Sequence, residues 1–185
     1  MGLRAMVSRC SLTLAVCMVS LAPLQAQTPK GSPDPDGRAL WIGEWTLTGT
    51  GKSAPEQPEY GLTCRLHGRL ILGGHFVQID QVWKASGPEQ HALEILSYDP
   101  SNKSYNSQGF LGNGSTWVAT ATFDGRTYAE EGTTKTPDGK AVRFRCTWTF
   151  SPDRMAVDGA EEIDQGGARW TSFTVKGTRA RLTAE

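Results

Sequence analysis

The chain has 185 residues, and its 19 lysines and arginines balance 19 aspartates and glutamates, so the formal net charge is zero. That balance offers no general attraction for nucleic acid or for an anionic membrane surface. The length is sufficient for one domain with a substantial core. We therefore expect a single domain that binds no nucleic acid.

The first 26 residues have the form of a secretory signal peptide. Arg4 and Arg9 precede a largely apolar run from Cys10 to Leu24, and Ala26 offers a small residue for cleavage. The run is shorter than the roughly 20 residues that a membrane-spanning helix needs. A retained anchor is the alternative. We predict that residues 1–26 are removed and that the protein is exported, to the periplasm or outside the cell, without a membrane span in its mature form.

Residues 27–39 are polar and contain Pro29, Pro33 and Pro35, with no periodicity. This composition predicts a flexible leader. No second shift of composition and no internal repeat follow it. Residues 40–180 are therefore expected to form the only folded domain.

From residue 41 to residue 179 the chain predicts short strands. Apolar and polar residues alternate over Leu62–Leu72, Trp117–Phe123 and, most regularly, Val142–Phe150. A period of two in segments rich in Thr, Val and aromatic residues is typical of half-buried strands. No segment of this region has a clear helical period.

Tight-turn sequences separate these segments. Asp124-Gly125 is a two-residue hairpin sequence, because both residues tolerate the positive φ angles of such turns. The other turns are Asp99–Lys103, Thr136–Lys140, Ser151–Arg154 and Gly166-Gly167. Counting the segments gives about ten strands, nearly all joined to their neighbours in sequence. Such a meander avoids exposed strand edges by closing into a barrel. We predict an all-β fold, a single up-and-down antiparallel barrel; a two-sheet sandwich is the alternative.

Two cysteines, Cys64 and Cys146, remain after removal of the signal peptide. Each lies on the apolar face of its own predicted strand. In an exported protein such a pair suggests one disulfide across the interior. Two buried free thiols are the alternative, which the sequence leaves open.

Gly43-Glu44-Trp45 and Arg179 resemble the closure signature of lipocalin-like (calycin) barrels, in which a first-strand tryptophan packs under a late arginine. The whole domain is similar to a family of exported bacterial proteins known only as a domain of unknown function. The further motifs that carry this resemblance are Leu72–Phe76, Ser97–Pro100, Lys103–Tyr105, Asp124-Gly125, Trp170 and Gly177–Arg179. The resemblance implies a lipocalin-like barrel, with Trp45 and Arg179 closing it, and no established activity.

The parity of the strands also predicts the walls of an internal pocket. The candidate wall residues are His75, Trp83, His91, Trp117, Phe144, Trp148 and Glu161. Neighbouring residues of a strand point to opposite faces, so only one member of Glu130-Glu131 and of Glu161-Glu162 can face inward. Glu161 is favoured because it shares parity with Val157 and Ile163.

No catalytic motif is present in the chain. There is no nucleophile elbow, phosphate-binding loop or Cys–His arrangement, and the three histidines lack metal-ligand spacing. We therefore predict no catalytic residues, no metal site and no cofactor. Haem held by His75 or His91 is the one alternative for a cofactor.

The function predicted from these features is the binding of a small hydrophobic or amphipathic ligand inside the barrel, without enzymatic activity. The alternative is a structural or protein-interaction barrel with a filled core, acting through outer stripes such as Arg65 and Arg69 or Arg143 and Arg145. An enzyme that uses Glu161 or His75 is a third hypothesis. The ligand and the oligomeric state are left open.

Overall fold

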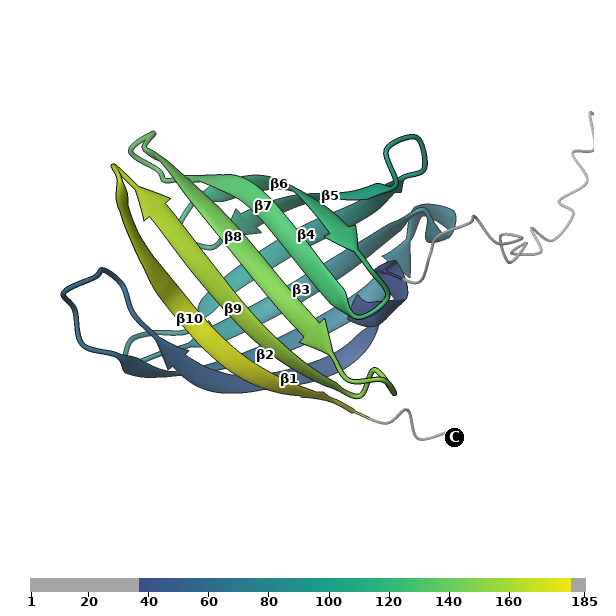
Figure 1. Cartoon of the computed structure of the whole chain (residues 1–185), viewed down its shortest axis with the longest axis horizontal. Coiled ribbons are helices and arrows are strands. Elements are labelled where there is room, and N and C mark those ends of the chain that lie inside the picture. Colours follow the sequence, from purple (N-terminus) through teal and green to yellow (C-terminus); the bar gives the residue numbers. More distant parts are fainter. Residues whose placement is uncertain (1–36, 181–185) are drawn as a thin grey trace, which may run out of the picture.

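A computed structural model describes residues 37–180 of the chain. Ten antiparallel strands close into a single up-and-down barrel (Figure 1), as the alternation predicted. The predicted signal peptide and residues 27–36 of the predicted leader lie outside the described residues. Within the described range, no helix is long and apolar enough to cross a membrane.

Each strand pairs with its neighbours in sequence, and the first strand closes the barrel against the last, from Trp45 opposite Arg179 to Gly51 opposite Phe173. The strands are β1 (Gly43–Gly51), β2 (Tyr60–Ile71), β3 (Phe76–Lys84), β4 (Gln90–Asp99), β5 (Ser104–Leu111), β6 (Thr116–Phe123), β7 (Thr127–Lys135), β8 (Ala141–Phe150), β9 (Ala156–Gln165) and β10 (Ala168–Arg179). Two 3-10 helices, η1 (Arg38–Trp41) and η2 (Leu72–Gly74), complete the fold.

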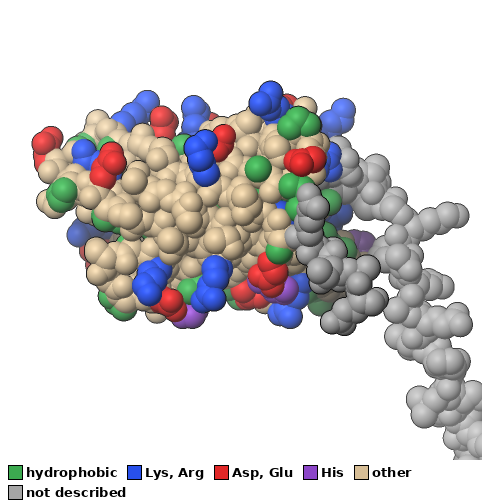
Figure 2. Space-filling view, turned by 90° about the horizontal axis from the view of Figure 1, so that it is seen from below, with side chains coloured by type: hydrophobic (Ala, Val, Ile, Leu, Met, Phe, Trp, Pro, Cys, Tyr) green, Lys and Arg blue, Asp and Glu red, His purple; other side chains and the backbone are tan. Residues whose placement is uncertain are grey.

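Alternation along the strands separates the interior from the surface. On β8, Phe144, Cys146 and Trp148 are buried while Arg143 and Arg145 are exposed, as the sequence predicts. Figure 2 shows one face of the outer surface, on which charges of both signs are interspersed. No single-sign patch is apparent on that face.

The predicted inward face of β2 ends before the strand does. Leu62, Cys64 and Leu66 face inward, but Leu70 and Leu72 are 52% and 72% exposed. Leu72 lies in η2, after β2 has ended at Ile71, and Leu70 lies one residue before that end, opposite Val77 of β3.

The last three residues of the predicted leader, residues 37–39, pack against the barrel. Gly37 and Arg38 are buried, and Arg38 donates from Nη1 to the carbonyl oxygens of Gly74 and His75, at 3.2 and 2.6 Å. They are held in place because Leu40 and Trp41, which follow the exposed Ala39, are buried in one end of the barrel. We call η1, residues Arg38–Trp41, the plug.

The plug closes its end of the barrel with aromatic packing. The Trp41 ring meets Tyr128, Trp148 and Phe150 edge-on, with centroid distances of 5.7, 5.3 and 5.4 Å. Edge-to-face pairs at such separations stabilise a core beyond simple burial. Gly68 permits the close approach of the plug, because a Cβ there would lie 1.7 Å from the Trp41 carbonyl oxygen.

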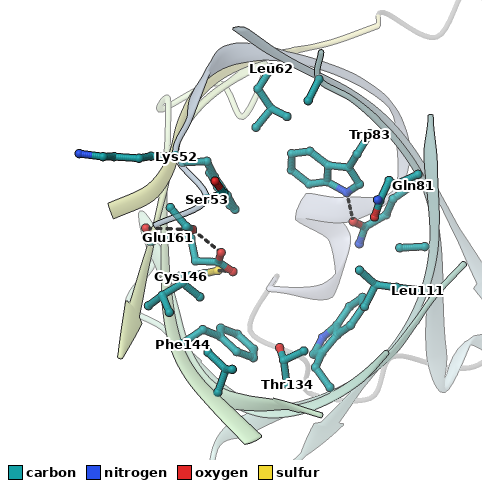
Figure 3. Close-up of a pocket in the computed structure, with 18 of the residues that line it drawn as sticks. Lys52, Ser53, Leu62, Gln81, Trp83, Leu111, Thr134, Phe144, Cys146 and Glu161 are labelled. Atoms are coloured by element: carbon teal, nitrogen blue, oxygen red, sulfur yellow. Dashed lines mark hydrogen bonds between the residues drawn. The ribbon is translucent and has the colours of Figure 1, made fainter. Parts of the chain in front are cut away.

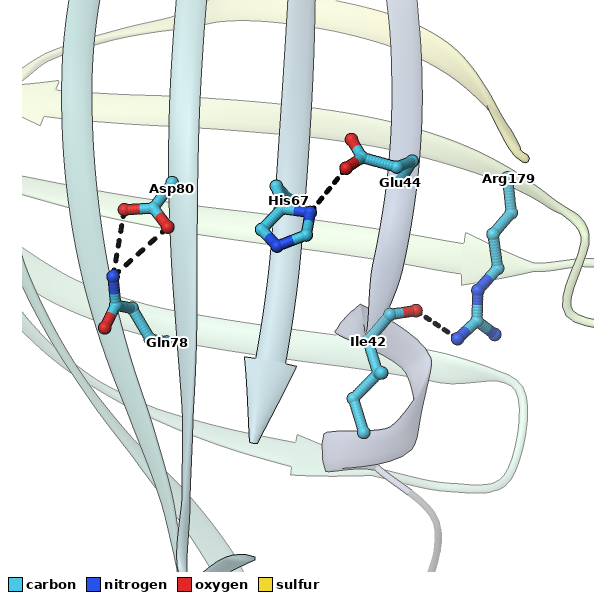
Figure 4. A network of polar contacts seen from close by, with 6 residues as sticks. All are labelled: Ile42, Glu44, His67, Gln78, Asp80 and Arg179. Atoms are coloured by element: carbon cyan, nitrogen blue, oxygen red, sulfur yellow. Dashed lines mark hydrogen bonds and ion pairs between the residues drawn. The ribbon is translucent and has the colours of Figure 1, made fainter. Parts of the chain in front are cut away.

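Arg179 binds the plug from the outside of the barrel. Its guanidinium lies 5.7 Å from the centre of the Trp45 ring, and Nη2 donates to the carbonyl oxygens of Ala39 and Ile42 (Figure 4). Trp45 in turn donates from Nε1 to the Leu40 carbonyl at 3.2 Å. The tryptophan and arginine of the closure signature thus lie together, and both bind the plug.

Candidate ligand-binding site

The barrel contains a cavity of about 670 Å³ that opens at the end opposite the plug. Loop residues such as Lys52 and Pro88 surround its mouth, while Phe144 and Trp148 lie deeper. Figure 3 shows Trp83, Leu111 and Phe144 projecting into the space from different sides of the barrel. The interior is therefore filled at the plugged end and hollow toward the other.

Aromatic rings line the cavity on several strands. They are Tyr60, Trp83, Trp117, Phe144, Trp148, Trp170 and Phe173. Phe173 lies between two of the indoles, with ring centres 5.5 Å from Trp83 and 5.9 Å from Trp148. The indoles of Trp117 and Trp148 lie close against backbone because the facing positions are glycines.

The glycines that make this room are Gly109 and Gly159. A Cβ on Gly109 would lie 2.0 Å from the ring of Trp117, and one on Gly159 would lie 2.3 Å from the ring of Trp148. Any larger residue would push these rings into the cavity. The open volume therefore depends on small residues opposite large ones.

Five of the seven predicted wall residues line the cavity as expected from strand parity. These are Trp83, Trp117, Phe144, Trp148 and Glu161. His75 does not. It is exposed at the plugged end, because β3 begins only at Phe76 and His75 still belongs to the η2 turn.

His91 lies among the lining residues, but at the mouth, where it is exposed. Leu93 and Ile95, which share the strand face of His91, do not face the interior. The register of β4 against β3 instead places Glu94 opposite Ile79 and Leu96 opposite Val77, so the other parity points inward. Apolar residues on both faces of β4 made its orientation ambiguous from sequence.

Glu94 is consequently an interior carboxyl that the sequence interpretation missed. Its two oxygens accept hydrogen bonds from Gln81 Nε2 at 2.9 Å and from Ser107 Oγ at 2.8 Å. The indole of Trp83 donates to Gln81 Oε1 at 2.8 Å, and that of Trp117 donates to Ser107 Oγ at 3.1 Å. Burial raises the pKa of Glu94 despite these donors.

Glu130 is the second interior carboxyl. The residue is 7% exposed, and within the described chain its Oε1 has no hydrogen-bond partner. Burial raises its pKa to about 8, and the nearby charges of Glu94 and Glu161 add to this shift. Glu130 is therefore mostly protonated at neutral pH. Its neighbour Glu131 is exposed and pairs with Arg145 on the outer surface.

Glu161 is the third interior carboxyl, and both of its oxygens have partners. Ser172 donates from Oγ to Oε1, and the Cys146 thiol lies 3.5 Å from Oε2 (Figure 3). Ser172 reaches this position because β10 bulges between Thr171 and Phe173. Burial raises the pKa of Glu161 as well.

The suggested disulfide between Cys64 and Cys146 is not formed: both residues are buried free thiols. Three strands (β1, β10 and β9) separate β2 from β8 round the barrel, so the two cysteines extend from different walls. Burial raises the pKa of both thiols, which keeps them neutral and unreactive.

We therefore expect neither thiol to react with iodoacetamide in the folded protein, because the reagent attacks the thiolate. Both are expected to react after unfolding in denaturant without any reductant. Peptide mapping by mass spectrometry separates these sites from Cys10 and Cys17. A Cys64–Cys146 cross-linked peptide from the unreduced protein would contradict the expectation.

The sequence matches the profile described as "Protein of unknown function (DUF1579)" over residues 39–179. The chain belongs to this DUF1579 family. Among solved structures, the crystal structure of Rv2717c from M. tuberculosis is similar, with a TM-score of 0.65 and 16% sequence identity over 81% of this chain and 99% of that one. At this identity the likeness shows the fold alone. The search of curated proteins finds no significant match.

The histidines of this DUF1579 barrel lie away from the deep part of the cavity. Among residues 37–180, no group of His, Cys, Asp and Glu side chains is arranged to hold a metal ion. His91 is confined to the mouth, His75 lies at the other end, and His67 pairs with Glu44 on the outer surface (Figure 4). A haem in the cavity would thus meet no deeply placed imidazole.

Proposed function

We propose that this DUF1579 protein binds a small amphipathic molecule inside the barrel and catalyses no reaction. The observation that carries the proposal is the open cavity of about 670 Å³ with aromatic walls and a few convergent polar groups. Ligand sites in proteins typically have volumes of about 300–1,000 Å³ and this mixture of lining residues. The export of the protein is part of the proposal and is supported by the sequence of residues 1–26.

The hydrogen bonds inside the cavity favour binding over catalysis. Donors from Gln81 and Ser107 hold Glu94, while Ser172 holds Glu161, so hydrogen bonds within the protein already fix the orientation of these carboxyls. Neither an imidazole nor an amine lies with them as a second catalytic group. The filled-core alternative is less well supported, because only the plugged end is packed solid.

The test is to block the cavity without changing the outer surface. Thr134 on β7 lines the cavity, whereas its neighbour Thr133 lies on the outer face. Thr134→Phe is expected to reduce binding of the neutral fluorescent probe N-phenyl-1-naphthylamine by about tenfold or more, because the ring takes ligand volume. Thr133→Phe adds the same ring outside and is expected to leave binding unchanged.

Probe fluorescence and thermal unfolding are measured together for both variants. Equal loss of binding in the two variants, or probe binding that Thr134→Phe leaves intact, would place the probe outside the cavity. Absence of binding by the unmodified protein would favour the structural or interaction barrel.

A further inference from the structure

The deep part of the cavity carries acidic groups without a basic partner. Glu94, Glu130 and Glu161 reach it from three strands, β4, β7 and β9. The basic residues among those that line the cavity are Lys52 and His91. Both belong to the mouth, and Figure 3 shows the Lys52 side chain pointing away from the space.

Within the described chain, two buried polar atoms of this region have no hydrogen-bond partner, the Tyr128 hydroxyl and Glu130 Oε1, and of these two residues only Glu130 lines the cavity. Glu94 and Glu161 have donors on both oxygens, but Glu130 Oε1 has none although the side chain is more than nine-tenths buried. The indoles of Trp83 and Trp117 already donate to Gln81 and Ser107, and the Tyr128 hydroxyl does not bond to Glu130. A buried polar atom without a partner is costly, so a ligand that donates to it gains that energy.

We propose that the ligand of this cavity is an organic ammonium ion, with an apolar or aromatic body and a protonated amine that binds Glu130. The inference rests on the proposed ligand-binding function and specifies the chemical class of the ligand. The ammonium group supplies the missing donor and the missing positive charge. The body lies against the aromatic walls, where the faces of Trp83, Trp148 and Phe173 also attract a cation.

The groups that face Glu130 are acidic or neutral on every side. Tyr128 precedes it on β7, Cys146 is its partner on β8, and Glu161 and Glu94 approach from β9 and β4. Burial raises the pKa of Glu130 to about 8, and the charges of Glu94 and Glu161 add to this shift, while the Ser107 hydroxyl opposes it. A bound cation favours the ionised form. Near neutral pH, Glu130 therefore loses its proton to the buffer as the ammonium ion binds, while the ammonium keeps its own.

Three probes with one body test the class of ligand: 2-(aminomethyl)naphthalene, which is cationic, 2-(hydroxymethyl)naphthalene, which is neutral, and 2-naphthoate, which is anionic. Calorimetric titration of the protein purified from its own host gives the affinities. The amine is expected to bind about 10- to 100-fold more tightly than the alcohol, and the acid more weakly than both. Titration in buffers of different ionisation enthalpy is expected to show release of up to about one proton per amine bound near pH 7.

Two pairs of neighbouring glutamates provide matched variants. Glu130→Gln keeps the shape and removes the charge, so it is expected to abolish the advantage of the amine over the alcohol and the release of a proton. Glu131→Gln makes the same change on the outer surface and is expected to alter neither. Glu161→Gln and Glu162→Gln repeat the comparison on β9. Glu161→Gln is expected to reduce the preference for the amine less than Glu130→Gln does, because Glu161 already accepts hydrogen bonds within the protein.

The outcomes separate this inference from the proposed function. Binding of amine and alcohol with equal affinity, both blocked by Thr134→Phe, would overturn the ammonium assignment and leave the ligand-binding cavity in place. Tighter binding of 2-naphthoate, or an amine preference that survives Glu130→Gln, would overturn it equally. If no naphthyl probe and no N-phenyl-1-naphthylamine binds, the proposed function itself fails, and the inference with it.

Discussion

Raising the pH from about 4.5 to about 8 is expected to lower the free energy of unfolding of this protein. The pKa of Glu130 is raised by burial from its ordinary value of 4.5 to about 8 in the folded state. The folded state therefore holds a proton that the unfolded state has lost over this range. The stabilisation from neutral Glu130 is complete below its unfolded pKa and disappears as the pH rises through about 8.

The expected loss is about 3–5 kcal/mol, because each unit of pKa difference corresponds to about 1.4 kcal/mol. The raised pKa values of Glu94 and Glu161 act in the same direction. Urea unfolding at a series of pH values measures this dependence. The test is the slope of the unfolding free energy against pH, and not the unfolding free energy at any single pH.

Glu130→Gln is expected to remove most of that slope, since the amide does not titrate. Glu131→Gln serves as the control, because the exposed Glu131 carboxylate is solvated and its pair with Arg145 is worth at most about 1 kcal/mol. Parallel pH curves for the unmodified protein and Glu130→Gln would show that Glu130 is not a buried neutral acid.

Replacement of Trp41 by alanine is expected to destabilise the protein by about 3–5 kcal/mol, as for other large aromatic residues in cores. The ring is 6% exposed and meets three other aromatic rings at the floor of the barrel. Its loss removes the main anchor of the plug and leaves a void that the rigid strands cannot close.

Urea unfolding at fixed pH measures the change, with Leu72→Ala as the control. Leu72 is also a large apolar residue but is 72% exposed, so its truncation is expected to cost less than about 0.5 kcal/mol. A cost below about 1 kcal/mol for Trp41→Ala would mean that the plug is not part of the folded core.

The sequence predicted the barrel well because its strands alternate strictly. On β8 the apolar and polar positions of Val142–Phe150 match the two faces of the wall, and the Asp124-Gly125 turn lies between β6 and β7 as expected. Alternation specifies which side of a strand is buried whenever one face is polar. The same reasoning placed Trp83, Trp117 and Glu161 in the cavity.

The prediction was wrong where local pattern does not determine the structure. β4 has apolar residues on both faces, so its orientation depends on pairing with β3, and Glu94 was missed in favour of His91. Arg38 and Ala39, the first two residues of the plug, were assigned to the flexible leader because the contacts of this segment with β2, β3 and η2 are distant in sequence. Parity allowed either Glu130 or Glu131 to face inward, and only the register of β7 against β8 decides it.

The existence of a ligand in the barrel is tested most directly by native mass spectrometry of the protein purified from its own host. We predict a discrete added mass that dissociates as an amine, that is retained in Thr133→Phe and that is lost in Thr134→Phe. Repeated preparations of the unmodified protein at the bare mass of the chain, with no uptake of the naphthyl probes, would contradict the account of this barrel as a binding protein.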